Sequence, residues 1–155
     1  MENIGPKIFE KEGLKIDKER VLTYSHLGCP LDCKYCFIED INFNQQTDVS
    51  YLSEKQFKLI ETLPEEIKLI MLGCDTEFFQ SWQDSLTILE KLTKFNKDIS
   101  IITKLALNNS RIAKLNEIDK KLRQHNNFLS LSISITCLES SKDWEPKVPT
   151  PKKKN

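Results

Sequence analysis

The spacing of hydrophobic residues predicts a chain of alternating strands and helices. Apolar residues recur at helical spacing over residues 82–95 and again over 112–122, which gives each helix one apolar face. Short runs of aliphatic and β-branched residues predict four strands, at 21–27, 67–72, 99–103 and 129–135. In the last run serines alternate strictly with aliphatic residues, so the two kinds should occupy opposite faces.

A further helix is predicted from its start and stop signals. Ser53 is a typical N-cap residue, and Gln56 three positions later completes a capping box. Leu52 and Phe57 are placed to form a hydrophobic staple across this helix start. The helix should run to about Leu63, because Pro64 cannot continue it. The polar residues 40–50, which precede it, are typical of a loop.

This alternation predicts an α/β fold with parallel strands joined by crossover helices. A barrel of eight strand–helix units takes about 250 residues, or roughly 31 per unit, so this chain holds about four units and does not close a barrel. Three segments are expected: an N-terminal extension (1–20), a partial core (21–141) and a Pro/Lys-rich tail (142–155). Prolines at 146, 149 and 151 exclude a helix interior or central strand there.

Composition and charge limit the classes of function. The 155 residues are enough for one domain with a real core, and 39% of them are hydrophobic. No apolar run approaches the roughly 20 residues of a membrane span, and the start lacks a secretory signal, so a cytoplasmic location is expected. The formal net charge is 0, which disfavours broad nucleic-acid binding.

Three of the five cysteines, Cys29, Cys33 and Cys36, lie within eight residues. Such spacing in a reducing compartment favours metal or redox chemistry over disulfides. Three thiolates can hold three irons of a [4Fe–4S] cluster and leave the fourth iron for a small molecule, unless Cys74 or Cys137 binds it. The alternative is a zinc site completed by His26 or another cysteine, although the chain has no second CxxC-like pair.

The CxxxCxxC spacing, with Tyr35 before the last cysteine and Phe37 after it, resembles the radical S-adenosylmethionine (SAM) superfamily. The resemblance implies a partial (β/α)6 TIM-like barrel, a [4Fe–4S] cluster on Cys29, Cys33 and Cys36, and SAM bound to the open iron. It further implies reductive cleavage of SAM to a 5′-deoxyadenosyl radical that abstracts a substrate hydrogen. An electron donor such as flavodoxin or ferredoxin would then be a partner.

The resemblance extends to Gly73-Cys74-Asp75-Thr76-Glu77, at the position of the family's glycine-rich acidic motif, which binds the SAM amino group. A carboxylate suits an amine because it accepts charge-assisted hydrogen bonds. Glu77 is therefore the first candidate and Asp75 the second, with Thr76 as a hydroxyl neighbour. The chain departs from the motif at Cys74, where the family has its second glycine. An ordinary solvated acidic turn is the alternative.

Three later segments resemble the spore photoproduct lyase-like branch: Ile102-Thr103-Lys104, Ser132-Ile133-Ser134 and Trp144-Glu145-Pro146. By this resemblance Lys104 and Ser134 would contact SAM, and DNA lesion repair becomes a candidate activity. Cys74 would lie near the lyase's hydrogen-donating cysteine, whereas the ordinary fate of a free cysteine is a small buried apolar residue.

The similarity ends where the family continues with further strand–helix units. Three functions fit these observations: a radical SAM enzyme that is short but competent, either alone or completed by a homologous or separate second subunit; a truncated remnant that binds a cluster without turnover; and a zinc or Fe–S interaction module.

Overall fold

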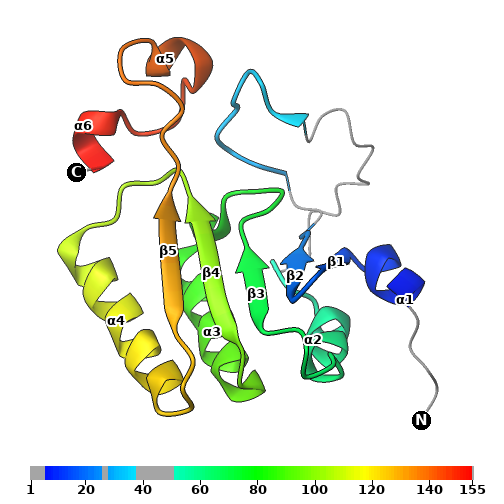
Figure 1. Ribbon diagram of the computed structural model, residues 1–155. Helices are drawn as coiled ribbons and strands as arrows, with labels where there is room; N and C mark the ends of the chain where they lie inside the picture. The colour runs from blue at the N-terminus through cyan, green and yellow to red at the C-terminus, as the bar shows by residue number, and fades with distance from the viewer. Residues whose placement is uncertain (1–5, 26–27, 38–50, 155) are drawn as a thin grey trace.

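A five-stranded sheet with linear order β1-β2-β3-β4-β5 forms the centre of the computed structural model, which describes residues 6–25, 28–37 and 51–154 (Figure 1). The strands are β1 (Leu14–Asp17), β2 (Arg20–Thr23), β3 (Leu69–Leu72), β4 (Asp98–Thr103) and β5 (Leu129–Ile133). β1 pairs antiparallel with β2, whereas β2, β3, β4 and β5 are parallel neighbours. Within the described residues the sheet stays open and mostly parallel, so the expected α/β class with an unclosed sheet is confirmed, whereas the antiparallel strand β1 differs from the expectation of parallel strands alone.

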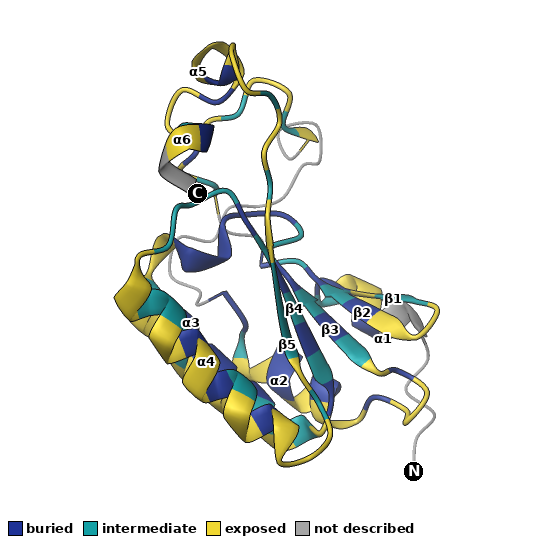
Figure 2. Ribbon diagram, turned by 60° about the vertical axis from the view of Figure 1, so that its left-hand side comes forward, coloured by how far each residue is buried: buried dark blue, intermediate teal, exposed yellow. Residues whose placement is uncertain are grey.

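Three helices cover one face of this sheet: α2 (Glu54–Glu61), α3 (Trp82–Leu92) and α4 (Asn109–Arg123) (Figure 2). The strands bury alternate residues on that side, including Ile70 and Leu72 of β3 and Ile99 and Ile101 of β4, all with no exposed surface. Each such aliphatic side chain contributes about 1.5–3 kcal/mol by leaving water. The core therefore lies between the sheet and these helices and fixes the strand register.

The helix start predicted at Ser53 is confirmed in detail. The Ser53 hydroxyl accepts a hydrogen bond from the Gln56 N–H at 3.1 Å, and the Gln56 side chain accepts one from the Ser53 N–H at 2.9 Å. Leu52 and Phe57 are both buried in the core. The helix ends at Glu61, with Thr62 as its C-cap, which is two residues before the predicted Leu63.

The N-terminal part of the sheet differs from the expectation. The sequence does not predict β1, because this strand is four residues long and carries charges. It turns into β2 through Lys18, a left-handed residue (φ 56°) without a typical turn sequence. The first predicted strand, 21–27, ends at Thr23. Leu27 and the predicted loop 40–50 lie outside the described residues.

The remaining helices are short: α1 (Pro6–Lys11), α5 (Ser141–Trp144), α6 (Pro151–Lys154) and the 3-10 turns η2 (Phe78–Gln80) and η3 (Thr93–Phe95). α6 begins at Pro151, where proline is tolerated because the first helical N–H needs no partner. None of the helices in the described part of the chain has the length and apolarity to cross a bilayer.

Candidate functional site

The carboxyl ends of the parallel strands carry the residues that the sequence singles out. The cysteine loop (residues 28–37), the segment after β3, the end of β4 and the segment after β5 all gather at this edge of the sheet (Figure 1). They line one cavity of about 170 Å³. Its lining includes every predicted site residue: Cys29, Cys33, Tyr35, Cys36, Phe37, Gly73, Cys74, Asp75, Thr76, Glu77, Lys104 and Ser134. Leu31, Ile102 and Thr103 complete the lining. Folding thus joins four segments that are far apart in sequence.

The cysteine loop presents free thiols. Cys29, Cys33 and Cys36 are partly exposed and none forms a disulfide. Burial raises the pKa of the Cys33 thiol, and Lys104 opposes this by favouring the thiolate. Across the described residues no three His, Cys, Asp or Glu side chains stand grouped as a metal site. Three free thiols on one cavity match the donor set of an iron–sulfur cluster in kind, and their convergence on a metal would accompany its binding.

The two cysteines considered as a fourth iron ligand, Cys74 and Cys137, lie at different places in the structure. Cys74 lines the cavity, and its thiol lies 3.6 Å from the Met71 carbonyl oxygen. Cys137 is outside the lining, and its sulfur lies 3.6 Å from the Ser140 hydroxyl. His26, the residue considered for a zinc site, lies outside the described residues.

Glu77 is 4% exposed and its carboxylate is bound by three protein donors. One oxygen accepts from the Thr103 hydroxyl at 2.7 Å and from the Phe79 N–H at 3.1 Å. The other oxygen accepts from the Lys104 N–H at 2.9 Å. Glu77 therefore ties the turn after β3 to the end of β4, and an incoming amine would share a carboxylate that already has structural partners.

Asp75 and Thr76 tie the same turn to the segment after β2. Asp75 is 5% exposed and accepts from the Ser25 hydroxyl at 3.1 Å. The Thr76 hydroxyl lies 3.4 Å from the Gly28 carbonyl, and the Gln80 side chain donates to the Thr76 oxygen at 2.6 Å. This acidic turn is therefore largely buried, and the alternative of an ordinary solvated turn does not describe it.

Gly73 lets β3 approach β4 closely at the cavity. Its φ is +84°, and a Cβ built there would lie 2.3 Å from the Ile102 carbonyl oxygen. The Gly73 N–H donates to the hydroxyl of Tyr51, which is buried and also contacts the Thr23 hydroxyl at 3.2 Å. Only a residue without a side chain fits this backbone path. The departure from the family motif at Cys74 is compatible with such a turn, because Gly73 takes the left-handed conformation.

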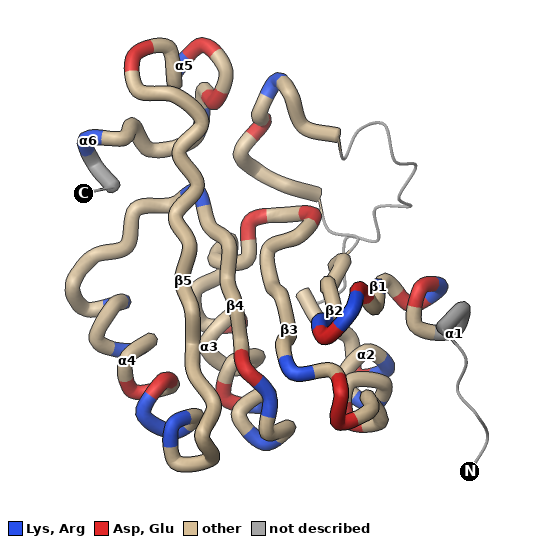
Figure 3. The backbone as a smooth tube through the Cα atoms, viewed as in Figure 1, with Lys and Arg blue, Asp and Glu red and all other residues tan. Residues whose placement is uncertain are grey.

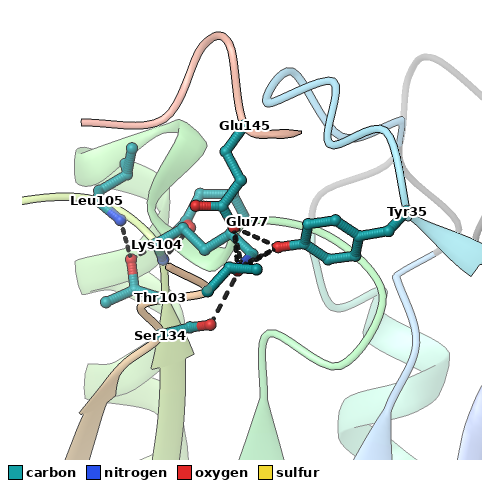
Figure 4. A network of polar contacts seen from close by, with 8 residues as sticks. Tyr35, Glu77, Thr103, Lys104, Leu105, Ser134 and Glu145 are labelled. Atoms are coloured by element: carbon teal, nitrogen blue, oxygen red, sulfur yellow. Dashed lines mark hydrogen bonds and ion pairs between the residues drawn. The ribbon is translucent and has the colours of Figure 1, made fainter. Parts of the chain in front are cut away.

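Lys104 is the centre of a polar network at the rim of the cavity (Figure 4). Its ammonium lies 2.5 Å from a Glu145 carboxylate oxygen, 2.7 Å from the Tyr35 hydroxyl and 3.1 Å from the Ser134 hydroxyl. Thr136 also donates to Glu145, at 2.6 Å. Burial alone would raise the pKa of Glu145, but hydrogen bonds from Lys104, Thr136 and Tyr35 outweigh it and lower the pKa to about 2. Glu145 is therefore charged at neutral pH.

Sequence reasoning gave no role to several members of this site, above all Glu145, Thr136 and Ser25. In the sequence Glu145 is only part of the segment Trp144-Glu145-Pro146, which lies in the predicted Pro/Lys-rich tail. Its partner Lys104 is 41 positions away in sequence, so no local spacing signals the ion pair. Figure 3 shows the acidic loop after β3 and the basic position at the end of β4 at the same edge of the sheet.

No protein-family model, curated protein or solved structure matches the chain.

One prediction concerns the pH dependence of Cys74. Burial raises its pKa to about 11, so the thiol should keep its proton at neutral pH. At pH 8 its thiolate fraction should be about two hundredfold lower than that of an ordinary thiol. Iodoacetamide labelling, followed by peptide mass spectrometry from pH 7 to 11.5, should show half-maximal rate near pH 11. A midpoint near pH 8.5 would contradict this assignment, whatever the absolute rate.

Proposed function

We propose that this chain is a radical SAM protein that binds a [4Fe–4S] cluster through Cys29, Cys33 and Cys36. The observation that carries the proposal is the common cavity: residues chosen from the sequence for one chemistry, in four separate segments, line the same space. The cavity lies at the carboxyl ends of parallel strands, where ligands bind in open α/β sheets and in barrels.

The cluster and SAM together would supply the radical chemistry, by one-electron cleavage of the sulfonium to a 5′-deoxyadenosyl radical. The chain's own residues would bind and orient. Thiolates of the loop would ligate iron, and a carboxylate of the turn after β3 would accept hydrogen bonds from the SAM amine. Lys104 would offer its ammonium to the SAM carboxylate or ribose, with Ser134 beside it. This would require the ligand to share Lys104 with Glu145.

The proposal gives Cys74 a role beside the cavity. Its raised pKa keeps the thiol protonated, and a protonated thiol carries the hydrogen atom that a substrate radical would need. The S–H bond would break, hydrogen would pass to the substrate radical, and the unpaired electron would remain on sulfur. The alternative role is that of a small, partly buried side chain that only fills space in the cavity wall.

The partners follow from the same proposal. A flavodoxin- or ferredoxin-type protein in the cytoplasm would deliver the electron. A second subunit would add strands to complete a (β/α)6 TIM-like barrel, because β5 is the last strand of the described sheet and its residue Ile133 is 36% exposed. The lyase-like resemblance suggests a DNA lesion as substrate, which the protein would have to bind with a formal net charge of 0.

Anaerobic reconstitution with iron and sulfide tests the proposal. The expected result is a brown protein that absorbs at about 400 nm. Addition of SAM should change the EPR signal of the reduced cluster, and dithionite should then release 5′-deoxyadenosine. A cluster without this release would identify a cluster-binding remnant, and bound zinc without iron would identify an interaction module. Either of these outcomes would overturn the proposed activity.

A second prediction separates the two acidic candidates for the SAM amine. Glu77→Ala should weaken SAM binding about tenfold while iron content stays near that of the unmodified protein, because the lost carboxylate faces the amine rather than iron. Equilibrium dialysis of SAM against reconstituted protein measures the affinity, and thermal melting records the stability lost with three hydrogen bonds. Asp75→Asn is the competing variant and Glu65→Ala, at an exposed position, is the control. Greater loss in Asp75→Asn would move the amine contact to Asp75.

A further inference from the structure

Three neighbouring residues of the cysteine loop bind three neighbouring residues near the C-terminus. The Lys34 N–H donates to the Trp144 carbonyl at 2.9 Å, and the Tyr35 hydroxyl donates to a Glu145 carboxylate oxygen. Asp32 pairs with Lys147 at 3.3 Å. We call residues 141–151 the clamp segment. Its contacts fall between the cysteines, on the part of the loop that determines where Cys33 and Cys36 point.

The clamp segment holds its own shape through local contacts. The Glu145 N–H donates to the Ser141 carbonyl at 2.8 Å, and the Val148 N–H donates to the Glu145 carbonyl at 3.2 Å. The Lys142 ammonium caps the turn by donating to the Val148 carbonyl at 2.7 Å. Val148 itself is 2% exposed. The segment is therefore a folded turn that presents Glu145, not a loose tail.

Glu145 joins this turn to both the cysteine loop and the sheet. Its side chain is 2% exposed, and one carboxylate oxygen takes bonds from Lys104, Thr136 and Tyr35. A carboxylate so deeply buried is costly unless it is fully paired, so its position depends on the Lys104 ammonium at the end of β4. Tyr35 is 45% exposed, but its hydroxyl is held in place by the Lys104 ammonium and the Glu145 carboxylate.

We propose that Glu145 is a positioning residue, which anchors the cysteine loop to the end of β4 through Tyr35 and makes the clamp segment part of the cluster site. This inference rests on the proposed function, since it assigns the clamp to support of iron ligands. Replacing a residue that orients a metal ligand through hydrogen bonds typically lowers metal affinity or activity by about 10- to 100-fold. The clamp would act on the loop without touching iron or SAM.

The protein without its cluster provides the first test. Glu145→Gln removes the charge at nearly constant shape, and Glu139→Gln makes the same change at an exposed position of the adjoining segment. Thiol labelling of Cys33 and Cys36 should become about tenfold faster in Glu145→Gln, whereas labelling of Cys74 should not change. Glu139→Gln should label like the unmodified protein. Equal acceleration at all cysteines would indicate general loss of stability and would overturn the positioning role, as would unchanged labelling.

Tyr35→Phe provides the second test and does not depend on whether Glu145→Gln folds. It removes only the hydroxyl from an exposed ring, and it should accelerate labelling of the same two cysteines. Because both residues act through one contact, the double variant should label no faster than the faster single variant. Additive effects would overturn the proposed link through Tyr35.

The reconstituted protein separates this inference from the proposed function. If the unmodified protein takes up a cluster, both Glu145→Gln and Tyr35→Phe should alter the EPR line shape of that cluster and diminish its change with SAM. Glu139→Gln should leave both signals intact, and normal signals in all variants would overturn the inference. If the unmodified protein takes up no iron, the proposed function fails, while the labelling experiments still decide whether the clamp orders the loop.

Discussion

Replacement of Cys29, Cys33 or Cys36 by alanine is expected to abolish reductive cleavage of SAM. Each thiolate is assigned to one iron, so loss of any one leaves a second iron without its protein ligand. Iron and sulfide content after anaerobic reconstitution should fall, and release of 5′-deoxyadenosine, measured by chromatography with dithionite as reductant, should drop to the level without protein. These are the largest effects expected for any substitution in the chain, because they remove the cofactor rather than adjust it.

Cys137→Ala is the matched control, because it also removes a thiol but lies outside the cavity lining. It should retain cluster and activity. The comparison also bears on the fourth ligand: if Cys74→Ala loses iron as completely as the three loop variants, then Cys74 occupies the corner assigned to SAM. That result, or full activity in any single loop variant, would refute the assignment of the ligands.

Gly73→Ala is expected to be the most destabilising substitution outside the core. The new Cβ would lie 2.3 Å from the Ile102 carbonyl oxygen, in a strand that cannot shift without breaking its pairing with both neighbours. The left-handed φ of +84° adds strain for any residue with a side chain. We expect a loss of about 3 kcal/mol in the free energy of unfolding, measured by urea denaturation.

Asn96→Ala provides the control for that substitution. Asn96 is exposed, has a left-handed φ of 53°, and already carries a Cβ, so this change alters side-chain preference without adding an atom. It should cost less than about 1 kcal/mol. If Gly73→Ala unfolds no more easily than Asn96→Ala, then the close approach of β3 to β4 at the cavity is not a feature of the folded protein.

Local sequence signals predicted the main elements well because their causes are local. Ser53 and Gln56 satisfy each other's backbone partners within one helical turn, and Leu115, Ile118 and Leu122 share a face by spacing alone. β1 escaped prediction because its four residues are stabilised by pairing with β2 rather than by a pattern of their own. The segment taken for a tail escaped for the same reason: its contacts are with residues about a hundred positions earlier in the sequence.

The candidate site divides in the same way. The cysteine spacing, the acidic turn and the alternating serines of β5 can be recognised from the sequence alone. They restrict the kinds of chemistry that the candidate site could perform before any fold is known. Only the tertiary structure decides that Cys74, and not Cys137, lines the cavity. It also decides which groups donate hydrogen bonds to the two carboxylate oxygens of Glu77 and which groups pair with Glu145. The reason is physical: pairing of parallel strands brings their carboxyl ends together whatever lies between them, and burial of a carboxylate depends on donors from other elements.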